Sequence, residues 1–281
     1  MKKTAMIFQG IVFLTMASFA SLTSCQKELQ SPIAASQKTN AKSSLNVIAS
    51  GDTLLNVTYE SGTLNSGITG LGSTSASAPD AAYMISPGKT GNYGIAHKVV
   101  LDDTAYLSAG QPRSESDALG ITNARFQPGY ARRYEFSVLL KDWTTWTSSM
   151  PADADILFQA KPTSGGPFFF IAAKRNAIVF RHGATAQDNL VSDYTSYINQ
   201  WIDFRVDVLW SNSGTGTYSV YTRLPGGNYT LKAQYSNESN YSSTSAYGYI
   251  KWGLYRADQS TANGSVTTRI AYHDNISIIA L

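Results

Sequence analysis

Apolar and polar residues alternate at several places in the second half of the chain, and this pattern predicts β-strands. Between residues 133 and 140 every second residue is apolar, and because successive strand residues point to opposite faces, one face of this segment should be buried. A second alternation covers residues 202–210 and ends at the turn-forming sequence of residues 211–214. Another candidate strand, residues 218–223, follows closely, so the two segments are predicted to form a hairpin.

Further strands are expected throughout the body of the chain, whereas helical periodicity is hard to find after the first 20 residues. The other candidate strands are residues 156–161, 168–173, 177–181, 229–231, 249–255 and 275–280. Many short strands and an aromatic content of 12% favour an all-β sandwich or jelly roll over a small barrel. The 17 tyrosines fit this class, because tyrosine prefers strands and most copies there are structural.

The amino-terminal end has the pattern of an export signal. Its basic first residues precede an apolar run, residues 6–20, that is too short to span a bilayer stably. Residues 22–25 then resemble the site at which bacterial lipoproteins are cut and acylated, and Cys25 is the only cysteine. We expect a signal peptide at residues 1–24 and an exported protein anchored to the bacterial outer membrane by lipid on Cys25. Residues 26–28 resemble the tags of surface-exposed lipoproteins.

The rest of the chain divides into a tether and one domain. Residues 25–50 are rich in small and polar residues and cannot bury enough apolar surface to fold, so we interpret them as flexible. Residues 51–281 fit a single all-β domain. Two of the 22 basic residues lie in the signal peptide, which leaves 20 against 19 acidic residues, a balance that argues against a nucleic-acid binder. We expect a monomer that contacts the membrane only through its anchor.

Three short segments place polar side chains two residues apart on expected strands, where they must share a face. The first segment holds Arg113 and Glu115, and the second holds Gln159 and Lys161. In the third segment, residues 249–255, the apolar residues at even-numbered positions are expected to face the core. The residues that this arrangement would present together are Tyr249, Lys251 and Tyr255.

In this order the three segments resemble the Arg-x-Glu, Gln-x-His and Tyr-x-Lys-x-Gly-x-Tyr elements of the alginate-lyase and heparin-lyase-like polysaccharide lyases. Aromatic segments at residues 136–143 and 201–210, and the sequence at residues 273–276, support the resemblance, which covers most of the chain after the tether. It implies a concanavalin-like β-sandwich, or jelly roll, with a concave substrate groove. It also implies β-elimination at a uronic acid of an acidic polysaccharide, of the alginate, glucuronan or glycosaminoglycan type, without a cofactor.

The resemblance further implies a role for each matched residue. Arg113 and Gln159 would hold the carboxylate of the uronic acid and stabilise the negative charge that develops there. Tyr249 would donate a proton to the leaving oxygen. The residues implied to bind other parts of the substrate are Glu115, Lys251, Tyr255 and Arg256.

The sequence departs from the family pattern at Lys161, where the family usually has histidine. Lysine is a poor base unless burial or nearby cations lower its pKa. We favour the interpretation that Lys161 adds positive charge to the groove while Tyr249 serves as both base and acid. Alternatively, His97 or His182 enters the groove from another strand. In a third interpretation the chain kept the groove and lost the chemistry, as a noncatalytic glycan-binding lipoprotein of a polysaccharide-uptake system.

Other functional classes find less support. Each polar pair taken alone also fits an ordinary exposed strand face. A retaining glycosidase of related fold needs two carboxylates about 5 Å apart, whereas Asp203 and Asp207 fit a surface whose charge is balanced by Arg205. The three histidines lack zinc-ligand spacing, and the chain has no phosphate loop or Gly-x-Ser-x-Gly turn. Asp102-Asp103 offers oxygen ligands for calcium, although adjacent carboxylates more often belong to a turn.

Overall fold

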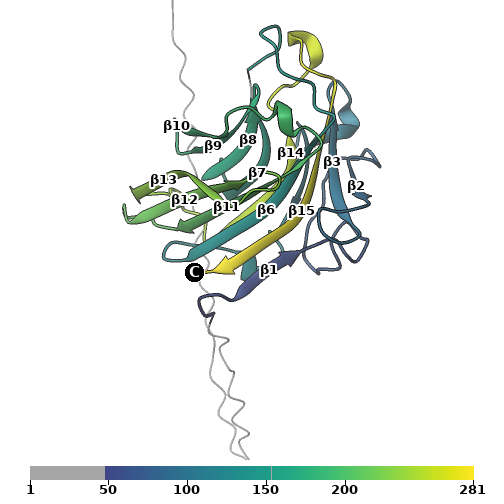
Figure 1. Ribbon diagram of the computed structural model, residues 1–281. Coiled ribbons are helices and arrows are strands. Elements are labelled where there is room, and N and C mark those ends of the chain that lie inside the picture. The colour runs from purple at the N-terminus through teal and green to yellow at the C-terminus, as the bar shows by residue number, and fades with distance from the viewer. Residues whose placement is uncertain (1–47, 153) are drawn as a thin grey trace, which may run out of the picture. The chain divides into compact units, whose positions relative to one another are not determined.

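A computed structural model describes residues 48–152 and 154–281, which form 15 strands and four short 3-10 helices. The strands make two antiparallel sheets that pack face to face (Figure 1), so the predicted all-β sandwich is confirmed. In this part of the chain no helix is long and apolar enough to cross a membrane. The expected signal peptide, the lipidated Cys25 and nearly all of the tether lie outside the described residues.

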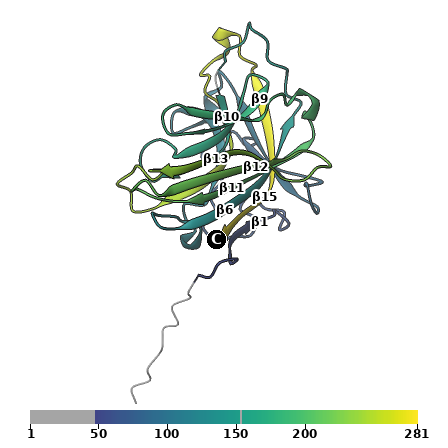
Figure 2. The ribbon, with the colours of Figure 1, turned by 60° about the vertical axis from the view of Figure 1, so that its left-hand side comes forward.

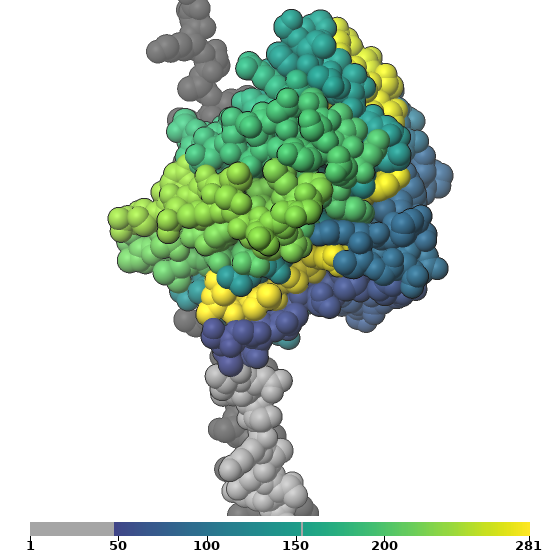
Figure 3. All heavy atoms as spheres, viewed as in Figure 1, coloured from purple at the N-terminus to yellow at the C-terminus, as the bar shows by residue number. Residues whose placement is uncertain are grey.

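The eight-stranded sheet forms one layer of the sandwich, and Figure 2 shows its strands β13, β12, β11 and β6 side by side. Its strands, in spatial order, are β13 (Thr230–Glu238), β12 (Gly216–Arg223), β11 (Trp201–Leu209), β6 (Ala131–Lys141), β15 (Thr268–Ala280), β3 (Gly94–Val100) and β2 (Ala82–Ile85), and β1 (Thr53–Val57) pairs with β15 outside this path. The purple β1 and the yellow end of β15 lie side by side at the lower edge of Figure 3. The two ends of the domain are therefore joined by hydrogen bonds within one sheet.

The seven-stranded sheet forms the other layer and contains all three motif segments. Its strands, in spatial order, are β10 (Ala186–Val191), β9 (Ala177–His182), β8 (Phe169–Lys174), β7 (Ala154–Pro162), β14 (Gly248–Tyr255), β5 (Gln111–Asp117) and β4 (Leu107–Ser108). The motif strands β7, β14 and β5 are direct neighbours, although the chain between β7 and β14 first makes six other strands. The site thus depends on long-range strand pairing.

The strands expected from alternation are present, and several are longer than expected. The hairpin of β11 and β12 pairs antiparallel over its whole length, as predicted. The last strand begins at Thr268, earlier than the expected residue 275. Its register with β6 shifts between Asp274 and Ser277, and this irregularity interrupts the alternation that would have revealed its first half. No clear sequence pattern predicted β1, β2, β3, β4 or β10.

Aromatic side chains from the inner faces of both sheets form the core. Phe136 of β6 and Phe158 of β7 stack with ring centroids 4.1 Å apart, and both are almost completely buried. Trp210, at the end of the β11 alternation, stacks on Phe126 at the same centroid distance. Burying such large rings supplies much of the apolar stabilisation and fixes the two sheets against each other. The inward side chains of β7 therefore hold its opposite face in a fixed position.

The outer face of the eight-stranded sheet carries a row of ion pairs. Arg133 contacts Asp207 at 2.7 Å, Arg205 contacts Glu135 at 2.7 Å, and Asp203 accepts a hydrogen bond from Arg223 at 2.6 Å. Asp203 and Asp207 are charge-balanced as expected, but by Arg223 and Arg133, because Arg205 pairs with Glu135 instead. No glycosidase-like carboxylate pair is formed there, because each acid has its own cation.

Candidate functional site

Strand register brings the motif residues together on the outer face of the seven-stranded sheet. In the pairing of β14 with β7, Tyr249 lies opposite Lys161 and Lys251 lies opposite Gln159. In the pairing of β14 with β5, Tyr255 lies opposite Arg113. Directly opposed residues share a face and lie about 5 Å apart across neighbouring strands. We call this surface the site face, and define it by Arg113, Glu115, Gln159, Lys161, Tyr249, Lys251 and Tyr255.

Glu115 holds the polar side chains at the centre of the site face. Its carboxylate is buried, and it accepts hydrogen bonds from Gln159 Nε2 at 2.5 Å and from Lys251 Nζ at 2.7 Å. Arg113 Nη1 lies 4.0 Å from the same carboxylate. An amide nitrogen has two N–H groups, so Gln159 keeps one for a ligand after donating the other to Glu115. Glu115 therefore positions the donors instead of binding an anion itself.

Arg113 is held in place by a backbone carbonyl of the adjacent strand β4 and by an aromatic ring. Its Nε donates a hydrogen bond of 2.7 Å to the carbonyl of Ser108, and its guanidinium lies 5.2 Å from the centre of the Tyr255 ring. These contacts fix the plane of the guanidinium while its terminal nitrogens retain N–H groups for a ligand. Planar guanidinium groups bind carboxylates through two parallel hydrogen bonds, so this geometry suits an acidic sugar.

Tyr249 and Lys161 lie at one end of the site face, and their pKa values shift in opposite directions. Burial, followed by the charges of Asp117 and Glu115, raises the pKa of Tyr249 to about 12. Burial, followed by the positive charges of Lys251 and Arg113, lowers the pKa of Lys161. Tyr249 therefore keeps its proton at neutral pH, whereas Lys161 releases its proton more readily than an exposed lysine does.

Asp117 belongs to this site and was missed in the sequence analysis. It lies two residues beyond Glu115 on β5, opposite Lys251, and its charge acts on Tyr249. The signal was available, because the alternation that aligns Arg113 with Glu115 extends to Asp117. It was overlooked because the motif ends at Glu115.

The site face continues across β8 and β9 beyond the motif residues. Phe170 lies opposite Gln159, and Arg181 lies opposite Phe170 with its guanidinium 5.8 Å from the ring centre. A cavity of about 400 Å³ lies on this side, lined by Tyr255, Phe170, Arg181 and Lys174 among others. Sequence reasoning placed strands here, but the order of strands in the sheet, which brings Arg181 beside the motif, emerges only from the fold.

Arg256 does not lie on the site face, so the prediction that it binds substrate is wrong. The residue is fully buried, with Nε 3.9 Å from Asp155 Oδ1 and Nη1 donating to the carbonyl of Thr267 at 3.0 Å. It directly follows Tyr255, and adjacent residues of an extended chain point to opposite sides. Arg256 is therefore part of a buried ion pair that supports the sheet from behind.

Neither His97 nor His182 reaches the site face, which excludes the proposed histidine replacement. His97 is fully buried, with Nε2 3.1 Å from Ser116 Oγ, and Ser116 points away from the site face because it neighbours Glu115 on β5. His182 lies opposite the core residue Phe169. The third histidine, His273, is buried against the carbonyl of Leu157. All three imidazoles are thus on the inner side of the sheets.

The acidic residues considered for calcium have other partners. Asp102 accepts hydrogen bonds from Thr261, and Asp103 caps the 3-10 helix Thr104–Tyr106 through the amide of Ala105. Across residues 48–152 and 154–281 no group of three or more His, Cys, Asp or Glu side chains is arranged to hold a metal ion.

The chain was compared with known families and structures. The family described as Polysaccharide lyase matches residues 59–277, and no curated protein matches the sequence. The endo-β-1,4-glucuronan lyase of the fungus Trichoderma reesei is 14% identical, with a TM-score of 0.51 over 76% of this chain and 95% of that chain. Alginate lyase AlgAT5, from polysaccharide lyase family 7, is 16% identical, with a TM-score of 0.52 over 78% of this chain and 99% of that chain.

The same fold also occurs in a domain with another role. The binding domain of Paraclostridial Mosquitocidal Protein 1 is 13% identical, with a TM-score of 0.52 over 82% of this chain and 49% of that chain. At such low identities the structural matches establish a shared fold and nothing more. A shared fold does not by itself imply a shared function.

Proposed function

The chain belongs to the polysaccharide lyase family, and we propose that it cleaves an acidic polysaccharide at a uronic acid by β-elimination. One observation carries this proposal. Strand register places Arg113, Gln159, Lys161 and Tyr249 on one face of three neighbouring strands. These side chains supply the carboxylate donors, the base and the acid that the reaction requires.

The reaction sets three requirements. A base removes the proton from the carbon that bears the carboxylate, and the released electron pair forms a double bond to the next carbon. The bond from that carbon to the glycosidic oxygen breaks, and an acid protonates the departing oxygen. Negative charge spreads onto the carboxylate as the first proton leaves, so hydrogen-bond donors to the carboxylate lower the barrier. In our assignment these donors are Arg113 and Gln159.

We assign the acid to Tyr249 and the base to Lys161. A phenol with a pKa of about 12 is protonated at neutral pH and can deliver its proton to the leaving oxygen. The lowered pKa of Lys161 makes its neutral amine, which is the form that accepts a proton, more accessible than that of an exposed lysine. This division differs from the expectation that Tyr249 performs both steps, because its surroundings disfavour the phenolate. Base and acid on the same face are compatible with syn elimination.

An acidic polymer suits the charges of the site face. Lys161, Lys251 and Arg113 lie beside the proposed reaction centre, and Lys174 and Arg181 extend the positive charge along the adjoining cavity. Glu115 is neutralised locally by its contacts with Lys251 and Gln159. The named alginate and glucuronan lyases of this fold are consistent with a uronate substrate. Glycosaminoglycans remain in the substrate class that we propose.

A noncatalytic glycan-binding protein is the second candidate, and one observation favours it. Lys161 occupies the position at which the resembled lyases have histidine, and the binding domain of Paraclostridial Mosquitocidal Protein 1 shares the fold. We further propose that either protein works outside the cell, anchored through Cys25 to the outer membrane. Acyl-chain labelling of the cell-grown protein, compared with Cys25→Ser, tests this anchor; label on both proteins would contradict it.

The lyase proposal is tested by ultraviolet absorbance of the unsaturated uronate product. The protein is incubated with alginate, glucuronan and glycosaminoglycans, beside Tyr249→Phe and the control Tyr221→Phe. Tyr221 lies on the other sheet, opposite Arg205, so its variant should retain activity. A rise in absorbance that Tyr249→Phe abolishes supports the proposal. Binding of these polymers without any product would identify the noncatalytic protein instead.

A further inference from the structure

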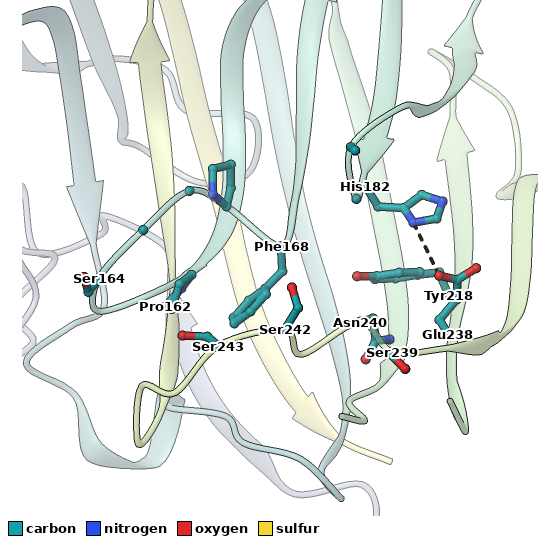
Figure 4. A pocket seen from close by; sticks show the side chains of 15 residues that line it. Pro162, Ser164, Phe168, His182, Tyr218, Glu238, Ser239, Asn240, Ser242 and Ser243 are labelled. Atoms are coloured by element: carbon teal, nitrogen blue, oxygen red, sulfur yellow. Dashed lines mark ion pairs between the residues drawn. The ribbon is translucent and has the colours of Figure 1, made fainter. Parts of the chain in front are cut away.

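A second cavity, separate from the site face, lies between three connections of the fold (Figure 4). It has a volume of about 350 Å³, and none of the residues that define the site face lines it. Its walls come from the β7–β8 connection at residues 162–168, the β9–β10 turn at residues 182–184, and residues 238–243 after β13, with Tyr218 of β12. We call it the serine cavity, after Ser164, Ser239, Ser242 and Ser243.

The charge of the serine cavity is opposite to that of the site face. Glu238 is the only acidic side chain that lines the cavity, and no lysine or arginine lines it. His182 lies with Nδ1 3.9 Å from Glu238 Oε2, and burial lowers the pKa of its imidazole, so the ring is neutral at neutral pH. A uronate or another anion would meet a carboxylate here without a compensating cation. The cavity therefore selects against the acidic polymer proposed for the site face.

Two buried polar groups beside the cavity lack hydrogen-bond partners. The hydroxyl of Tyr218 and Nε2 of His182 are both buried and unpaired within the described chain. In Figure 4 the Tyr218 hydroxyl is directed toward the side of the cavity where Phe168 and Ser242 lie. Unpaired buried polar groups are rare and costly, so an unpaired hydroxyl directed at a cavity indicates a missing partner.

The remaining walls combine an aromatic face with a fixed polar loop. Phe168 packs on Tyr241 with ring centroids 4.6 Å apart, and it is almost fully buried. Asn240 anchors the loop by accepting from the amide of Ser211 at 2.8 Å and donating to the carbonyl of Leu209 at 3.0 Å. The serines on either side of Asn240 are thus held near the cavity. Preformed cavities of this size, with an apolar wall and a few polar groups, are typical ligand sites.

We propose that the serine cavity binds a neutral sugar or a similar neutral polyol. Sugar hydroxyls both donate and accept, which matches the tyrosine and serine hydroxyls, the imidazole and the Glu238 carboxylate. The apolar face of a pyranose ring suits Phe168. The site goes beyond the proposed lyase activity, because it shares no side chain with the site face and takes an uncharged ligand.

The experiment measures sugar binding by amide chemical shifts in the complete protein. D-glucose, D-mannose and D-galactose are titrated as neutral probes, with D-glucuronate as the anionic comparison. We expect at least one neutral probe to shift the amides of His182, Ser242 and Ser243, and glucuronate to leave them unchanged. Tyr218→Phe should weaken that binding about fivefold or more, since it removes one hydrogen-bonding group. It should not lower the melting temperature, because the hydroxyl has no partner to lose.

Two controls make the outcome decisive. Tyr249→Phe changes the site face and should leave neutral-sugar binding intact, while Tyr218→Phe should leave lyase activity intact. No shift at these amides with any neutral probe overturns the proposal, as does binding that Tyr218→Phe does not weaken. A stronger response to glucuronate, or loss of binding in Tyr249→Phe alone, would place the sugar on the site face and equally overturn it.

Discussion

Lys161 lies directly opposite Tyr249 in the antiparallel pairing of β7 with β14, with Nζ 5.9 Å from the centre of the phenol ring. The two side chains share the site face, but their surroundings shift their pKa values in opposite directions. Burial opposes charge on both groups, and the acidic neighbours of Tyr249 and the basic neighbours of Lys161 add to that effect. Relative to exposed side chains, both pKa shifts move the pair toward a neutral amine beside a neutral phenol, which is the protonation state that our assignment requires.

Substitution of Lys161 separates a proton-accepting role from a purely electrostatic one. Lys161→Arg keeps the positive charge, but a guanidinium does not deprotonate in this pH range, so we expect kcat to fall by about 10²-fold or more. Lys161→His introduces the histidine that the resembled lyases have at this position, and it should retain most of the activity. Steady-state kinetics on the best substrate measure both. Full activity in Lys161→Arg would show that the residue supplies charge alone.

The pH profile gives a second test of the same pair. Since the neutral amine is the active form, activity should rise with pH through the lowered pKa of Lys161 and fall again as Tyr249 loses its proton near its pKa of about 12. Histidine has an ordinary pKa of about 6.5 against about 10.4 for lysine, so Lys161→His should move the rising limb to lower pH. If the rising limb of the pH profile stays in place in Lys161→His, that limb reports another titratable group.

Glu115→Gln should impair catalysis without unfolding the protein. The carboxylate fixes Gln159 and Lys251 through two hydrogen bonds, and the amide of glutamine can accept only one of them well. A small misplacement of positioning groups can cost about 10²-fold, so we expect a loss of that order in kcat/KM. Glu135→Gln, which breaks a pair with Arg205 on the other sheet, is the control and should remain active. Equal activity of both variants would contradict the positioning role.

Gly253→Ala should destabilise the fold at the centre of the site face. Its φ of +145° is rarely adopted by residues with a side chain, and a Cβ there would lie 2.3 Å from the carbonyl oxygen of Ser114 and 2.7 Å from the Cα of Glu115. We expect the free energy of unfolding in urea to fall by more than ~2 kcal/mol. Gly226→Ala, with φ +74° but no atom within 4 Å of its Cβ, should cost ~1 kcal/mol. Equal losses would show that backbone strain alone matters.

Asp203 should contribute stability that disappears in acid. Burial alone would raise its pKa, but hydrogen bonds from Lys89, Ser137 and Arg223 outweigh burial and hold the pKa below its usual range. A depressed folded-state pKa stabilises the protein above the unfolded pKa of about 3.9, and this contribution is lost as pH falls through the folded-state value. Asp203→Asn should therefore cost ~1–3 kcal/mol at neutral pH.

The difference between the two proteins should shrink as pH falls below about 4, because the wild-type carboxylate is then protonated. Melting temperatures recorded from pH 7 to pH 2 measure this convergence. Asp142→Asn, which alters an exposed pair with Lys141, should show little difference at any pH. Parallel curves for wild type and Asp203→Asn would show that the carboxylate does not stabilise the fold through its charge.

The sequence alone determined most of the strands and the faces of the motif residues. Period-two alternation is a local consequence of strand geometry, so the shared face of Tyr249, Lys251 and Tyr255 followed from spacing. The same rule, applied one residue further, places Arg256 on the buried side and would have prevented the wrong assignment. The same rule would also have placed Asp117 beside Arg113 and Glu115 on one face of β5. These parts of the site needed no knowledge of the fold.

Tertiary structure alone decided which strands meet and in which register. Gln159 lies opposite Lys251 although 91 positions separate them in the chain, and pairing over such a separation depends on the packing of the whole core. The inward positions of His97 and His182, the burial that shifts the pKa values of Lys161 and Tyr249, and the serine cavity all arise from this packing. They are properties of surroundings assembled from distant segments, which no local pattern specifies.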